Sequence, residues 1–191
     1  FVAGILLPFL LIALMAIAKN VPVTDPPQYQ AVFWVKGWSN SGSLNAKIKD
    51  DKHFEIIYTK NKSYIPSPSY AETVPKATLY IYTPNPSPDL ATIKEIVVEV
   101  PTTDLAKDTA TVSVPQIGEI VLTGEATAPD GYNFESYHYG RSSMITDIFG
   151  GYNNSGPVLI KTGRAIRIKQ PSGYYNGTPE FIGWVAKTGA Q

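Results

Sequence analysis

Three side chains that can do chemistry lie close together in the sequence, among several tyrosines. Glu135, His138 and Arg141 combine a carboxylate, an imidazole and a guanidinium, a set that can transfer protons or bind a metal ion. One histidine supplies too few ligands for zinc, and the other histidine of the chain, His53, is distant in sequence. The simpler interpretation is a hydrogen-bonded loop histidine, so we expect no catalytic site and no enzyme activity.

Established catalytic and phosphate-binding motifs do not occur in the sequence. There is no G-x-S-x-G, no glycine-rich phosphate loop and no H-E-x-x-H. The acidic residues are dispersed, and none of them fits the calcium-loop pattern D-x-[DN]-x-[DN]-G. We therefore expect no cofactor. Calcium held by loops that the fold brings together stays open, because its ligands need no regular spacing.

Tyrosines are concentrated in 130–157, the longest stretch without clear alternation of apolar and polar residues. A tyrosine buries a large area at low entropy cost and keeps a polar hydroxyl. If the head binds a partner such as a sugar or a neighbouring subunit, we expect this loop-rich stretch to form the binding surface. The alternative, left open, is that half of the tyrosines belong to the core or to strand edges. The candidate surface-recognition residues are Tyr132, Tyr137, His138, Tyr139 and Tyr152.

Three N-x-[ST] sequons mark Asn61, Asn153 and Asn176 as candidate N-glycosylation acceptors. All three lie in expected loops, which is where a glycan on an exported protein has to be attached. Some sequons occur by chance, and Asn176-Gly177 also fits a tight turn.

The composition limits the partners and indicates the fold class. The 191 residues carry 16 basic and 16 acidic side chains, so no strong field attracts nucleic acid, and none is expected as a partner. The absence of cysteine excludes disulfides and thiolate metal sites. A content of 16 Pro, 15 Gly and 12 Tyr favours an all-β domain with many turns.

Segments that alternate apolar and polar residues recur along the chain. In 95–100, Ile96, Val98 and Val100 share one face of a strand while the glutamates take the other. The segment 31–36 is nearly all apolar, as in a strand buried on both faces. About nine strands separated by Gly, Pro and Asn clusters predict a mainly β fold with a single β-sandwich head, jelly-roll or Ig-like. The other predicted strands are 54–58, 78–82, 109–114, 119–123, 157–160, 164–168 and 181–186.

Basic residues recur in the two predicted strands near the C-terminus. Lys161, Arg167 and Lys169 occupy odd positions and would share one face of a continuous strand. We expect them to form a solvated edge that discourages the addition of a further strand.

The chain begins with an apolar run. Residues 1–18 carry no charge and are rich in helix-favouring Leu and Ala; as a helix they would extend about 27 Å, close to the hydrocarbon thickness of a thin bilayer. Pro8 predicts a kink in the second turn, and the prolines after residue 20 end the helix. We therefore expect three parts. They are a hydrophobic helix at 1–19 that forms a membrane anchor or filament core, a proline-rich linker at 20–30, and a β-sandwich head at 31–191.

A chain that starts with an aromatic residue and an apolar helix resembles the type IV pilins, in which a short basic leader is removed in front of the hydrophobic run. Bacterial members usually have a glutamate as fifth residue, whereas Ile5 stands here; archaeal members, which commonly lack it and carry β-rich heads, match better. The resemblance implies an exported subunit of a cell-surface filament with adhesive heads. Such a subunit is membrane-inserted as a precursor and then assembles with many copies of itself. The implied assembly-helix residues are Phe1, Ile5, Leu6, Pro8, Leu10 and Leu14.

Other assignments stay open at this point. Ala16-Ile17-Ala18 has the small-x-small form that signal peptidase accepts, so a signal-peptide remnant is one alternative. A membrane-anchored jelly-roll virion or capsid protein would use the same helix to span a viral membrane. A filament subunit joined by strand donation and an anchored carbohydrate-binding domain are two further alternatives.

Overall fold

The computed structural model of the chain describes residues 25–49, 53–65, 73–87, 90–117, 119–136, 156–162, 164–169 and 177–186. This part of the chain folds into antiparallel strands and contains no α-helix, so the prediction of a mainly β fold is confirmed. The helix predicted at 1–19 lies outside the described residues. The elements are β1 (Ala31–Lys36), β2 (Gly42–Ile48), β3 (Phe54–Lys60), β4 (Lys76–Thr83), β5 (Thr92–Glu99), β6 (Thr109–Val112), the 3₁₀ helix η2 (Pro115–Ile117), β7 (Leu122–Thr123), β8 (Asn133–Glu135), β9 (Val158–Lys161), β10 (Arg164–Arg167) and β11 (Pro179–Val185).

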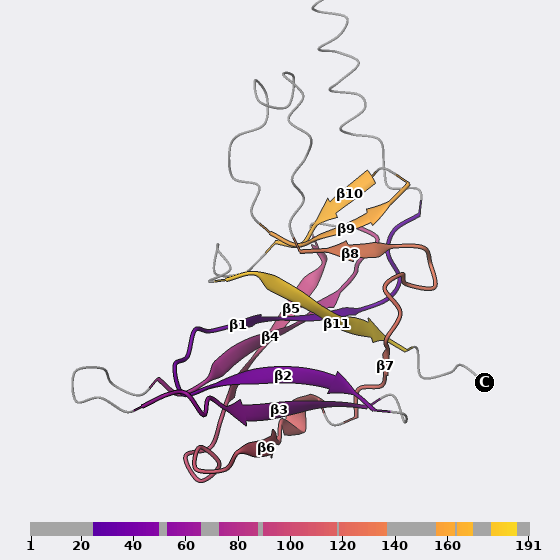
Figure 1. Ribbon diagram of the computed structural model, residues 1–191. Coiled ribbons are helices and arrows are strands. Elements are labelled where there is room, and N and C mark those ends of the chain that lie inside the picture. The colour runs from indigo at the N-terminus through magenta and orange to yellow at the C-terminus, as the bar shows by residue number, and fades with distance from the viewer. Residues whose placement is uncertain are drawn as a thin grey trace, which may run out of the picture.

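Five strands form a central sheet in the order β5-β4-β1-β11-β7 (Figure 1). β1 lies in the middle of this sheet and pairs antiparallel with both β4 and β11, so that Phe33 lies opposite Tyr80 on one side and Phe181 on the other. Every residue of β1 except the terminal Lys36 is buried, as the apolar segment 31–36 predicts. Backbone hydrogen bonds along both edges and packing on both faces therefore fix β1 in place.

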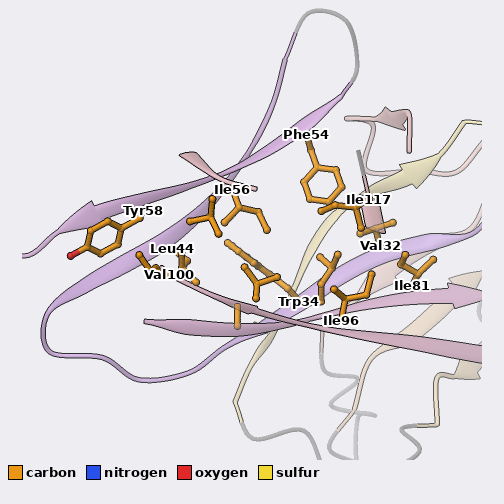
Figure 2. Packing of buried hydrophobic residues seen from close by; sticks show 14 of the residues in the cluster. Val32, Trp34, Leu44, Phe54, Ile56, Tyr58, Ile81, Ile96, Val100 and Ile117 are labelled. Atoms are coloured by element: carbon orange, nitrogen blue, oxygen red, sulfur yellow. The ribbon is translucent and has the colours of Figure 1, made fainter. Parts of the chain in front are cut away.

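One face of the central sheet packs on a three-stranded sheet of order β2-β3-β6. Trp34 and Val32 from β1 meet Ile56 and Leu44 from the outer sheet, and all of these side chains are buried (Figure 2). This first core follows from alternation, because the even-numbered residues of β1 point to this side. Other members are Phe54, Tyr58, Ala77, Leu79, Ile81, Ile96, Val98, Val100, Val112, Ile117 and Leu122.

The opposite face of the central sheet packs on a second three-stranded sheet, of order β10-β9-β8. Here the odd-numbered residues of β1 meet Leu159 of β9, and aromatic rings fill much of the space. Phe134 of β8 lies 5.1 Å from Phe33 and 5.0 Å from Phe181, measured between ring centroids. Other members of this second core are Ala31, Val35, Tyr80, Tyr82, Ala128, Tyr132, Ile166, Ile168 and Trp184.

The prediction of a single sandwich is not confirmed, because the described strands form three sheets with a core on each side of the middle one (Figure 1). The physical reason lies in β1 and β4. Both strands carry large apolar side chains on both faces, for example Leu79 and Tyr80, which are 0% and 4% exposed. A sheet with two apolar faces needs a cover on each of them.

The predicted strand segments correspond to observed strands, with differences at their ends. The segment 119–123 contributes only the two residues of β7. Two strands were missed. In β2, Leu44 is buried and Ala46 and Ile48 are partly buried, whereas Ser43, Asn45 and Lys47 are exposed. β8 lies within 130–157, a stretch predicted to be loop-rich. β8 has only three residues, too few to show alternation, and the prediction of a loop was wrong for this strand.

Candidate functional site

The segment that leads into β1 is attached to the domain by a group of polar residues. We call Asp25, Gln28, Asp130, Tyr132 and Lys161 the anchor cluster. Lys161 Nζ donates to the Asp25 carboxylate and, at 2.6 Å, to the Asp130 carbonyl oxygen. The Tyr132 hydroxyl donates to the Asp25 carbonyl oxygen at 2.6 Å, and the Gln28 backbone amide donates to the Asp130 carboxylate at 2.7 Å. Three separate parts of the chain are thus joined at one place.

A tight turn at 128–132 supplies Asp130 and Tyr132 to this cluster. The turn is closed by hydrogen bonds from Gly131 N to Ala128 O at 2.8 Å and from Ala128 N to Tyr132 O at 2.7 Å. Gly131 has a φ of 87°, which favours glycine. The Lys161 ammonium lies 5.4 Å from the centre of the Tyr132 ring, close enough for a cation–π contact.

The electrostatics of the anchor cluster keep Lys161 positively charged. The hydrogen bond to Asp25 raises the pKa of Lys161, and the charges of Asp25, Tyr132 and Asp130 add to this effect, while desolvation opposes it. Burial raises the pKa of Tyr82 to about 12, with a smaller contribution from the nearby Tyr132. Lys161 therefore stays positively charged at neutral pH.

The remaining residues before β1 also contact the domain. Pro27 is buried, the Gln30 side-chain amide donates to Thr83 Oγ1 at 3.1 Å, and the Gln30 carbonyl oxygen accepts from Val185 N at 2.9 Å. Within the linker predicted at 20–30, residues 25–30 thus pack on the domain and lead directly into β1.

A second feature lies at the other end of β1. We call the loop 37–41, the turn 61–65 and the segment 73–75 the Trp38 tip. Trp38 is 79% exposed, and Ile65 and Val74 in the same three segments are 83% and 37% exposed. Because β1 has six residues at about 3.3 Å each, the Trp38 tip and the linker are separated by roughly 20 Å along this strand.

A network of short polar side chains holds the three segments of the Trp38 tip together. The Asn40 side-chain oxygen accepts from Thr73 N at 3.0 Å and from Thr73 Oγ1 at 2.9 Å. The Thr73 carbonyl oxygen accepts from the hydroxyls of Ser39 at 2.6 Å and Ser41 at 2.9 Å. The Asn61 side-chain amide donates to the Asn40 carbonyl oxygen at 3.1 Å. The loop that carries Trp38 is therefore held by hydrogen bonds to the turn 61–65 and to the segment 73–75.

The structure corrects one predicted recognition residue. Tyr132 is 3% exposed and belongs to the second core, so it is not a surface-recognition residue; its ring packs between the sheets while its hydroxyl binds the linker. Tyr137, His138, Tyr139 and Tyr152 lie outside the described residues, as do Arg141, Asn153 and Asn176. Among the candidate glycosylation sites, Asn61 is described and is exposed.

The basic strand face predicted near the C-terminus is only partly observed. Arg167 and Lys169 are exposed, but Lys161 turns to the anchor cluster instead of remaining solvated.

In the described parts of the chain, no group of three or more His, Asp or Glu side chains is placed to bind a metal ion. The same residues contain no helix with the length and apolar character needed to span a membrane.

Sequence reasoning did not find the Trp38 tip or the role of Lys161. A usable signal exists for Trp38, because this large apolar residue stands in the turn-forming stretch "GWSNSG", where burial is difficult. No local signal exists for Lys161, whose partners lie far away in sequence.

The contacts of the anchor cluster and of the Trp38 tip join segments of the chain that are distant in sequence. Comparison of the whole chain with known protein families, curated proteins and solved structures gives no match.

Proposed function

We propose that the chain is a structural subunit of an extracellular, pilus-like filament. In this proposal residues 1–19 form a helix that anchors the subunit in the membrane and then packs with the helices of other copies. The β-rich domain forms the head on the outside of the filament. Burying even half of the apolar run contributes on the order of 10 kcal/mol at ~25 cal/mol per Å², which would drive assembly.

The observation that best supports this proposal is that the described end of the linker, residues 25–30, leads into the middle of the head. Residues 25–30 are hydrogen-bonded to the domain, and β1 follows them without a free hinge. β1 is paired on both edges and buried on both faces. Tension applied to the N-terminal segment would therefore load many hydrogen bonds of β1 at once. A filament subunit needs such a connection between its core and its head.

Filament assembly by strand donation is less well supported. β5 is an edge strand of the central sheet, eight residues long, and it could in principle accept a strand from a neighbour. Its exposed positions include Lys94, Glu95 and Glu99, however. Charged side chains along an edge strand oppose pairing with another strand. We therefore place the assembly contact in the apolar run.

The test is to delete residues 1–18 from the full chain and to image the product by electron microscopy. The proposal expects dispersed subunits with a far-ultraviolet circular dichroism spectrum typical of strands. Two point variants refine the test, because Leu10→Arg places a charge in the apolar run whereas Leu10→Ile preserves its character. Leu10→Arg should abolish filaments and Leu10→Ile should retain them. Filaments that persist after the deletion rule out the helical core.

A further inference from the structure

The Trp38 tip brings an exposed indole and a glycosylation sequon to the same place. Asn61, Lys62 and Ser63 form the sequon, and the Asn61 side-chain amide donates to the carbonyl oxygen of Asn40, two residues after Trp38. The Asn61 backbone amide also donates to the Ser41 carbonyl oxygen at 2.8 Å. The turn that carries the sequon and the loop that carries Trp38 are thus bonded to each other twice.

The sequon is fixed in an exposed turn. The Ser63 backbone amide donates to the Asn61 side-chain oxygen at 3.1 Å, which forms an Asx turn, and the Tyr64 amide donates to the Asn61 carbonyl oxygen at 3.1 Å. Asn61, Lys62 and Ser63 are all exposed. The Lys62 ammonium pairs with Asp108 at 2.9 Å, which draws this side chain toward the start of β6. The side chain of Asn61 is therefore held at a defined position in an exposed turn.

We propose that Asn61 carries an N-linked glycan whose first sugar lies on the indole of Trp38. This inference rests on the proposed function in one respect, since attachment requires an exported chain. It gives the exposed indole an occupant that belongs to the same chain. The apolar C–H face of a sugar ring covers an aromatic ring well, and the polar residues around Trp38 suit the sugar hydroxyls at its rim.

The covalent step needs a sugar donor of the lipid-phosphate class. The Asn61 side-chain nitrogen forms a bond to the anomeric carbon of the sugar, the bond from that carbon to the phosphate oxygen breaks, and the lipid phosphate leaves. One proton of the amide is lost to a base of the transferase. The nitrogen keeps its second hydrogen, which is enough for the 3.1 Å hydrogen bond to the Asn40 carbonyl oxygen.

Peptide mapping by mass spectrometry of the full chain, isolated from the cell surface of its source, tests the attachment. The peptide with Asn61 should carry a hexose- or hexosamine-containing mass. Ser63→Ala removes the sequon but keeps the Asn61 side chain and the backbone amide that it binds, so the modification should disappear. Ser63→Thr keeps the sequon, so the modification should remain. An unmodified Asn61 in the native chain overturns the inference.

Iodide quenching of tryptophan fluorescence tests where the sugar lies. The chain has three tryptophans, and because Trp34 and Trp184 are 2% and 0% exposed, the quenchable emission comes from Trp38. The native chain should show a lower quenching constant than Ser63→Ala. Equal constants for a glycosylated chain and for Ser63→Ala mean that the sugar points away from Trp38, and they overturn the second part of the inference.

Thermal unfolding gives an independent readout of the contact. Trp38→Ala should lower Tm by about 2–4 °C in the glycosylated chain, the shift expected for a contact of ordinary strength in a chain of this size. In the Ser63→Ala background, Trp38→Ala should leave Tm equal to that of Ser63→Ala alone, because an indole that is 79% exposed contributes little by itself. Equal shifts in both backgrounds contradict the contact.

The outcomes separate this inference from the proposed function. A filament whose Asn61 is unmodified overturns the glycan and leaves the filament intact. A chain with glycosylated Asn61 that never assembles overturns the filament and leaves the glycan intact.

Discussion

The Nζ of Lys161 on β9 binds the carboxylate of Asp25, which lies 136 residues earlier in the chain. The pair joins the segment before β1 to the outer sheet of the second core, and Asp130 and Tyr132 complete the contact. The path of residues 25–30 over the domain is therefore set in part by side-chain contacts. In a filament subunit, this path would influence how the head is oriented on the core.

Replacing Lys161 should loosen the linker without unfolding the domain. Lys161→Gln removes the charge and the hydrogen bonds to Asp25 and the Asp130 carbonyl oxygen, while both cores stay intact. Hydrogen exchange measured by mass spectrometry should become several-fold faster in 25–30 and remain slow in β1, since local opening needs only the local contacts to break. High salt should reproduce part of the effect in the unmodified chain.

Lys62→Gln is the matched control for this prediction. Lys62 also forms an ion pair, with Asp108, but at the opposite end of β1. Its replacement should leave exchange in 25–30 unchanged. If both variants, or neither, alter exchange in 25–30, Lys161 does not hold the linker.

Much of the central sheet could be predicted from the sequence, because β5 alternates apolar and polar residues and β1 is an unbroken apolar run. Ile96, Val98 and Val100 are buried as predicted, and Val97 between them is 66% exposed. The unbroken apolar run of β1 correctly predicted burial on both faces. The pattern indicates that both faces are covered, but it does not say by which strands.

The features that sequence reasoning missed depend on contacts between distant residues. β2 is the exception, because Leu44, Ala46 and Ile48 face the first core and alternate with the exposed Ser43, Asn45 and Lys47, a pattern that could have predicted the strand. The Lys161 side chain has an ion-pair partner only because the turn at 128–132 and the linker meet beside β9. Such a site has no local pattern that could predict it.

Gly42 at the start of β2 should not tolerate a side chain. A Cβ at this position would lie 2.4 Å from Tyr58 Cε2 and 2.6 Å from the Thr59 carbonyl oxygen, both on the paired strand β3. Because Tyr58 is fully buried, it has little room to move. Gly42→Ala should lower the free energy of unfolding by about 1–3 kcal/mol, measured by urea denaturation.

Gly124→Ala provides the comparison for Gly42→Ala. A Cβ at Gly124 would meet only Ile48 Cδ1, at 3.6 Å, which is an ordinary contact distance. Its effect on the free energy of unfolding should stay within about 0.5 kcal/mol. Equal costs at the two positions would mean that β2 and β3 are not packed as described.

The two cores should both contribute strongly to stability. Leu79 faces the first core and Leu159 the second, and both are 0% exposed. Each substitution to alanine should cost about 2–5 kcal/mol, because it removes buried methyl groups and leaves a cavity. Val97→Ala, at an exposed position on β5, should cost less than about 0.5 kcal/mol. A small cost for Leu159→Ala alone would show that the sheet of β8, β9 and β10 does not cover a core.

Tyr82 should make the domain less stable in strong base. Burial raises the pKa of Tyr82 to about 12 in the folded chain, and the charge of Tyr132 contributes to the increase. In the unfolded chain a tyrosine loses its proton near pH 10. Below about pH 10 both states hold the proton, so this group gives no pH dependence. Between about pH 10 and about pH 12 the unfolded chain releases the proton while the folded chain retains it, so stability falls by up to about 1.4 kcal/mol per pH unit.

Tyr82→Phe isolates this effect from the other groups that titrate in base, Lys161 among them. The variant keeps the buried ring but has no hydroxyl to titrate. Urea denaturation of both chains at intervals from pH 9 to pH 12 should show a steeper loss of stability for the unmodified chain, with a difference that reaches about 2–3 kcal/mol at the upper end. Parallel curves over the whole range would mean that Tyr82 is accessible to water in the folded chain, in contradiction to its 2% exposure within the second core.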